Sequence, residues 1–189
     1  MAALLVNRLT VTSAHGREVT PPASAAERLA AISEESVVTD RAPRALTAAE
    51  ADRLTEIAAR LRPAFGAGET ITEAATALND LLVRHAAVPS LRVDPGQPHR
   101  LAFHRPDAPL VDAWAADMGT ALAMVIGVGQ ATRLGACQAD GCDLVFFDTT
   151  RNGSRRFCDL SCQNRVKASA YRARRHAARR PSASGTDLG

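Results

Sequence analysis

The sequence predicts a mainly helical α+β protein: a helical N-terminal part with a small β-hairpin, then a small cysteine-rich unit that ends in a basic helix. Three observations support this prediction. Apolar residues recur at helical spacing behind helix-start signals in the first two thirds of the chain. All four cysteines fall between residues 137 and 162, and residues 160–180 contain arginines and a lysine but no acidic residue.

Two stretches of the N-terminal part begin with the spacing of a capping box. Thr47 and Glu50 precede one apolar helical stripe, and Thr70 and Glu73 precede another. In such a box the threonine hydroxyl and the glutamate carboxylate bond to each other's backbone N–H groups. We therefore expect a helix to begin at each threonine.

Weaker patterns complete the N-terminal part. Residues 23–35 and 107–125 each have apolar residues at helical spacing. Between the helices, "LRVDPGQPHRLAFH" indicates two short strands around the turn Asp94-Pro95-Gly96. No long apolar run is expected to cross a membrane, and no convincing secretion signal opens the chain, so we expect a cytoplasmic protein.

The N-terminal part has no catalytic pattern. It has no phosphate loop, dinucleotide fingerprint or nucleophile elbow. His85 lies on an apolar helical face and is expected to be structural, while His99 and His104 are expected at the surface or in loops. We expect that the protein is not an enzyme. The N-terminal part could instead bind a small-molecule effector or mediate assembly.

The cysteines are the strongest chemical signal in the chain. Their spacing is C-x4-C-x15-C-x3-C, and they are Cys137, Cys142, Cys158 and Cys162. Two close pairs about 15 residues apart are typical of a tetrahedral four-thiolate zinc site. Disulfides would need an oxidising compartment, and a closed four-thiolate shell leaves no position for catalysis. We therefore predict one structural Zn²⁺.

The segment between the two pairs favours a hairpin. "DLVFFD" is a plausible strand, Asn152-Gly153 suits a two-residue type I′ turn, and "RRFC" would form the returning strand. A unit of this size buries too little apolar surface to fold alone, so the metal would decide whether it folds.

Charge is divided unevenly along the chain. Residues 1–150 carry 13 arginines against 18 acids, whereas residues 151–189 carry 10 basic residues against 2 acids. An acidic body with a basic arm is common where the arm meets phosphates.

The basic arm is predicted to be a helix from about Leu160 to Pro181, capped by Asp159 or Ser161. A seam of small apolar residues is expected to dock it, namely Val166, Ala170, Ala173 and Ala177. Unrelieved like charge destabilises a helix, so a polyanionic partner is expected. Our candidate nucleic-acid contacts are Arg155, Arg156, Asn164, Arg165, Lys167, Tyr171, Arg172, Arg174, Arg175 and Arg179. The alternative for Arg155, Arg156 and Arg165 is that they balance the negative charge of the zinc–thiolate centre.

The segment "FFDTTRNGSRRFCDLSCQNRVKASAYRARR", with the two upstream cysteines, resembles the CGNR zinc-finger family of bacterial proteins. The resemblance covers about residues 133–175. One departure is Gln163, which replaces the glycine of the C-G-N-R signature and should leave metal binding unaffected. In that family an alanine-rich helical domain called ABATE precedes the finger, and such proteins are described as candidate stress-induced transcription regulators.

The resemblance implies an ABATE-like domain over residues 1–132, a CGNR-type finger with its basic helix over 133–180, and a disordered tail over 181–189. The first hypothesis is a cytoplasmic bacterial transcription regulator that binds DNA, the partner we favour. The alternative is a zinc-stapled module that binds RNA or an acidic protein. The finger has few aromatic residues for stacking on unpaired bases, which disfavours RNA.

Overall fold

The computed structural model describes residues 1–33, 46–93, 96 and 98–179. Its helices are α1 (Ala2–Leu9), α2 (Ala25–Ser33), α4 (Ala48–Leu61), α5 (Ile71–Arg84), α6 (Leu110–Gly127) and α7 (Leu160–Arg179). Its strands are β1 (Ser13–Ala14), β2 (Arg17–Glu18), β3 (Ser90–Arg92), β4 (Arg100–Ala102), β5 (Leu134–Ala136) and β6 (Val145–Phe147). Consecutive strands pair antiparallel into three two-stranded sheets. The predicted α+β class is confirmed.

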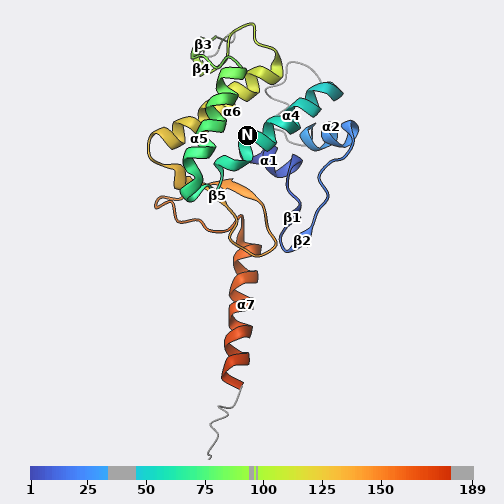
Figure 1. The fold of residues 1–189 in the computed structure, drawn as a ribbon, viewed down its shortest axis with the longest axis vertical. Coiled ribbons are helices and arrows are strands. Elements are labelled where there is room, and N and C mark those ends of the chain that lie inside the picture. The colour runs from blue at the N-terminus through green and yellow to red at the C-terminus, as the bar shows by residue number, and fades with distance from the viewer. Residues whose placement is uncertain (34–45, 94–95, 97, 180–189) are drawn as a thin grey trace, which may run out of the picture.

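The main hydrophobic core lies between α1, α4, α5 and α6 (Figure 1). Leu54 and Leu61 of α4 and Leu81 of α5 are fully buried there. Burying a side chain of this size contributes about 1.5–3 kcal/mol. Leu134 of β5 and Val145 of β6 belong to the same core. The strands that carry the first cysteine pair are thus packed on the helical body.

Helix α6 is the central element of this core. By length and composition it is the one described helix that is apolar enough to cross a membrane. Trp114, Ala115 and Ala116 are nevertheless buried by protein on successive faces of the helix. Gly119 lets α5 approach closely, because a Cβ there would lie 2.9 Å from a methyl carbon of Leu81. The packing accounts for the apolar composition of α6.

The two predicted capping boxes have different outcomes. At α4 the box is confirmed: Glu50 N donates to Thr47 Oγ1 over 3.3 Å, and Thr47 N donates to Glu50 Oε2 over 2.9 Å. Helix α5 begins directly after Thr70, as expected, but the predicted box of Thr70 and Glu73 is wrong, because Thr70 makes no side-chain cap bond. A 3-10 turn over Gly68–Thr70 leads directly into α5, and the Thr70 hydroxyl donates to the Ala67 carbonyl. The Thr70 hydroxyl is therefore bonded within the 3-10 turn and does not cap α5.

Two histidines fasten loops to α6. His85 Nδ1 lies 2.7 Å from Asp112 Oδ1, in the structural role predicted for it. His104 lies in the loop after β4, which is one of its two predicted positions, but it is buried there, and its Nδ1 is 3.0 Å from Asp117 Oδ1. His99 is exposed, as expected.

The predicted strand pair before α6 is confirmed as β3–β4, with Leu91 opposite Leu101. Residues 94 and 95 of its turn lie outside the described part of the chain, as do residues 34–35 of the first predicted helix and the tail 181–189.

The hairpin predicted between the two cysteine pairs does not form, because its first strand pairs with a different segment. Strand β6 pairs with β5, and the Phe146 ring lies so close over Gly135 that a Cβ there would collide with it. The segment that should have returned is a loop organised by the buried Asp148. Its carboxylate accepts bonds from the backbone N–H groups of Thr150 and Arg155, over 2.8 and 2.7 Å.

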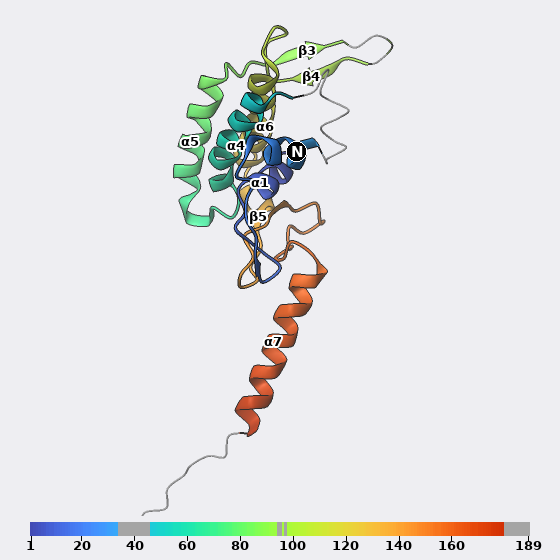
Figure 2. The same cartoon turned by 90° about the vertical axis from the view of Figure 1, so that its right-hand side faces the viewer.

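Helix α7 leaves the body after its first turns (Figures 1 and 2). Val166 is half-buried, but every residue from Lys167 to Ala177 is exposed. The docking seam predicted along Ala170, Ala173 and Ala177 is therefore wrong. The body extends only as far as the start of the helix, so these alanines have nothing to pack against among the described residues.

Direct bonds join residues 1–132 to the cysteine-rich part. Asn7 pairs with the backbone of Val145 through two hydrogen bonds of 2.8 and 2.9 Å. Gly66 N donates to Leu134 O over 2.7 Å, and Arg62 donates to Asp143 O. The domain division at residue 132 stays a prediction about independent folding.

Candidate metal centre and basic helix

The four cysteines gather where the β5–β6 region meets the start of α7. Cys137 and Cys142 lie between the two strands, and Cys158 and Cys162 flank the first turn of the helix. Cys142 and Cys162 are buried. The sulfurs of Cys142 and Cys158 are 3.8 Å apart. Two thiolates on one tetrahedral zinc lie about 3.8 Å apart, because each Zn–S bond is about 2.3 Å long.

A histidine from the other end of the chain also lies in this cluster. His15 Nδ1 is 3.6 Å from Cys162 Sγ and 4.0 Å from Cys158 Sγ. The donor atoms of His15, Cys142, Cys158 and Cys162 all lie within 4.8 Å of one another. A nitrogen and a sulfur on one tetrahedral zinc are about 3.6 Å apart. This cluster can therefore hold one zinc ion.

Cys137 lies beside this group of four. Its thiol interacts with the thiols of Cys158 and Cys142, and the backbone N–H groups of Cys158 and Ala139 point at its sulfur. Such N–H groups stabilise a metal-bound thiolate. The role of Cys137 as a ligand stays a prediction, and His15 is a candidate that the sequence analysis missed.

The thiols differ in how readily they ionise before metal binds. Burial raises the pKa of Cys137, and burial together with the neighbouring thiols raises the pKa of Cys158 far above its ordinary value. Burial also opposes ionisation of Cys142, but bonds from the His15 and Leu144 backbone N–H groups bring its pKa below the ordinary value. A bound divalent cation favours the thiolate at every ligand.

The first turn of α7 is fixed by Asp159. Its Oδ1 accepts a bond from Cys162 N over 3.0 Å, which is an N-cap bond and confirms one of the two predicted caps. This bond is the main reason that the pKa of Asp159 lies below its ordinary value. The same bond therefore fixes the position of Cys162 and the direction in which the helix starts.

This geometry, four clustered thiols at the root of a capped helix, is what a small zinc-stapled unit requires. Residues 133–175 match the CGNR zinc finger family. The match spans less than a quarter of the chain. A search of curated proteins finds no match to the chain.

Gln163 replaces the signature glycine of the CGNR finger. It lies inside α7, where Gln163 N donates to Asp159 O over 3.3 Å. Its backbone is ordinary helix, so a glycine is not needed for the fold at this position. The half-buried Gln163 side chain instead lines a pocket beside the helix.

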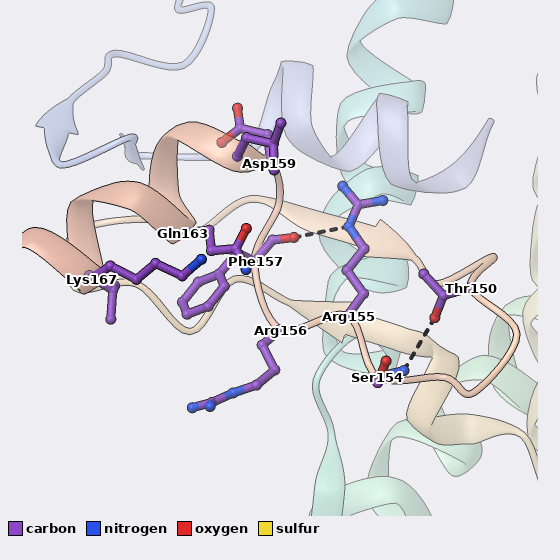
Figure 3. Close-up of a pocket in the computed structure, with 10 residues that line it drawn as sticks. Thr150, Ser154, Arg155, Arg156, Phe157, Asp159, Gln163 and Lys167 are labelled. Carbon is purple, nitrogen blue, oxygen red and sulfur yellow. Dashed lines mark hydrogen bonds between the residues drawn. The ribbon is translucent and has the colours of Figure 1, made fainter.

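Two arginines of the finger donate hydrogen bonds to groups of the cysteine cluster or next to it. Arg165 donates to Asp140 O and to Cys162 Sγ, and the bond to this sulfur raises the pKa of Arg165. Arg155 donates to the carbonyl of Phe157 (Figure 3) and to the carbonyl of Cys158. Both contacts favour the alternative role predicted for these cations, which is to stabilise the metal centre.

The other candidate contacts face solvent. Arg156 donates to Gln138 Oε1 over 2.7 Å at the edge of the finger, and Arg175 lies 5.8 Å from the centre of the Tyr171 ring. The exposed candidates on α7 are Asn164, Lys167, Tyr171, Arg172, Arg174 and Arg175. The side chain of Arg179 lies outside the described part of the structure.

An open pocket of about 600 Å³ lies at the root of α7, between the helix and the loop before it (Figure 3). Phe157, Leu160 and Val166 give it apolar walls, and Arg156 and Lys167 contribute cations. The finger therefore has a hollow surface beside the helix as well as the exposed helix itself.

Proposed function

We propose that the protein is a zinc-dependent, DNA-binding transcription regulator and that α7 is the element that enters the DNA. The observation that carries the proposal is the exposure of α7: from Lys167 to Ala177 it is exposed on all sides. At 1.5 Å per residue, this part of the helix is about 16 Å long. The major groove of B-DNA is about 12 Å wide and admits one α-helix.

The charge of α7 supports the same partner. Lys167, Arg172, Arg174 and Arg175 are exposed, and the helix contains no acidic residue. Arginine and lysine neutralise phosphates and release condensed counterions, which drives association with duplex DNA. Arg156 and Lys167 line the pocket in Figure 3, and in this proposal they bind the phosphate backbone next to the groove that α7 enters.

The role of the N-terminal part belongs to this proposal. We assign it an ABATE-like function, in which the helical body senses a small molecule or mediates assembly, in a cytoplasmic, bacterial, stress-responsive regulator. The direct bonds between the body and the finger support such a link, because a change in the body would reach the root of α7. The protein would act by binding and not by catalysis.

Fluorescence anisotropy with a duplex DNA tests the proposal. Four phosphate contacts would give a slope of about −3.6 for log affinity against log salt. Between 50 and 200 mM salt the affinity should then fall roughly a hundredfold. Replacing Arg172, Arg174 and Arg175 by glutamine should make the slope shallower by about 0.9 for each phosphate that is no longer neutralised.

The matched control is Arg100→Gln, which changes an exposed arginine on β4, at the far end of the molecule from α7 (Figure 2). The control should leave both affinity and slope unchanged. Salt-independent binding, or equal loss of affinity in the control and in the α7 variants, would contradict the proposal.

One observation favours the alternative partner, RNA. Tyr171 is 55% exposed beside Arg175, and an exposed aromatic ring next to arginine can stack on an unpaired base. A competition assay with duplex DNA, structured RNA and a polyanion separates the two partners. Duplex DNA should compete best, and stronger competition by RNA would favour the alternative.

A further inference from the structure

The metal centre is surrounded by five donors, whereas structural zinc takes four ligands. Four of the donors are the cysteines of the CGNR finger, and the fifth is His15 at the tip of the β1–β2 hairpin. His15 has a φ of 56° and Gly16 a φ of 81°, and a two-residue type I′ hairpin turn requires positive φ at both positions. The hairpin turn therefore sets the backbone conformation of His15.

The hairpin is fastened to the finger on both sides of His15. Gly16 N donates to Gly141 O over 2.8 Å, and Asp143 N donates to Ser13 O over 2.9 Å. The Ser13 hydroxyl also donates to the Asp143 carboxylate over 2.8 Å. These bonds fix the backbone of His15 next to the finger, so a change of side-chain rotamer alone moves the imidazole toward or away from the sulfurs.

The imidazole faces the sulfurs with its Nδ1 atom. The same nitrogen also lies 3.2 Å from the Ser161 hydroxyl and 3.5 Å from Asp159 Oδ2. A metal ion bound at Nδ1 would replace these two polar contacts. The imidazole remains 44% exposed, so it can move the short distance needed to bind an ion.

Cys137 competes for the same position. Its sulfur interacts with the backbone N–H groups of Cys158 and Ala139, but it stands outside the four donors that lie within 4.8 Å of one another. Cys142, Cys158 and Cys162 are shared by the two possible ligand sets. The sets differ only in whether the fourth ligand is a thiolate or an imidazole.

We propose that the zinc centre has an exchangeable fourth ligand. Three permanent ligands, Cys142, Cys158 and Cys162, hold the ion, and His15 binds it in the fourth position whenever Cys137 dissociates. With His15 bound, the metal joins the N-terminal hairpin directly to the root of α7. The inference rests on the zinc binding in the proposed function and not on its DNA binding, so the two can fail separately.

Cobalt(II) in place of zinc tests the exchange, because its visible absorption reports tetrahedral geometry and the number of bound thiolates. The Cys137→Ala variant should bind one cobalt per chain with tetrahedral bands and three-thiolate charge transfer. Adding His15→Ala should lower its cobalt affinity at least about 10-fold, because removing a ligand costs no less than removing an outer-shell partner. The matched control, Cys137→Ala with His99→Ala, should behave as Cys137→Ala alone.

Equal affinity and equal spectra for Cys137→Ala and Cys137→Ala/His15→Ala would overturn the proposal, since His15 would then not bind the metal. A second measurement uses the natural sequence and needs no variant to fold. Iodoacetamide should alkylate Cys137 before the other three cysteines, and the singly alkylated protein should retain one zinc. Release of zinc in step with alkylation of Cys137 would equally overturn it.

Discussion

Asn7 is a single side chain that joins two distant parts of the sequence. Its amide both donates to and accepts from the backbone of Val145, as a neighbouring strand would. The clustering of the four cysteines could be predicted from residue type and spacing alone. Asn7 and His15 could not, because each reaches a partner more than 120 residues away through tertiary packing. Local sequence patterns do not encode such a contact.

We predict that Asn7→Ala lowers the free energy of unfolding by about 1–3 kcal/mol, because it leaves the N–H and C=O of the buried Val145 without partners. Urea unfolding of the zinc-loaded protein measures the change. Asn79→Ala, on the exposed face of α5, is the matched control and should change stability little. Equal effects of the two substitutions would show that the Asn7 bonds do not stabilise the fold.

The elements show where sequence patterns succeed and where they fail. The capping box at α4 depends only on residues close in sequence, and it is confirmed. The strand at β6 was also visible as an apolar run, but its partner was not. Asn152-Gly153 resembles a hairpin turn, yet only Gly153 has a positive φ, and the bonds to Asp148 hold the segment as a loop. The bonds of the buried Asp148 carboxylate therefore favour a loop at this position over a returning strand.

Helix α7 beyond Val166 packs against no described residue, so its helicity there rests on intrinsic propensity. Ala173→Gly should cost about 1 kcal/mol of local helix stability. Circular dichroism should show reduced helicity and DNA binding should weaken, while the Tm of the body stays the same. Ala173→Gln, a good helix former at the same position, is the control and should keep the helicity. A lower Tm in Ala173→Gly alone would mean that the helix docks on the body.

As a whole, the molecule is a helical body with a basic rod at one end (Figure 2). The sequence predicted both parts from the division of charge and the helical periodicity. It did not predict how the rod is held. The predicted docking seam is exposed, and the helix is anchored instead by Asp159, Cys162 and Val166 at its first turns. With so little apolar contact, we expect the metal centre to fix the orientation of α7.

The most direct test of this account follows duplex DNA affinity as zinc is removed and returned. Affinity should fall as a chelator lowers the zinc content of the reduced protein, and it should recover when one equivalent of zinc is restored. Metal binding supplies much of the folding free energy of such small units, so the helix should lose its fixed orientation without it. Unchanged DNA affinity in zinc-free protein would contradict the account.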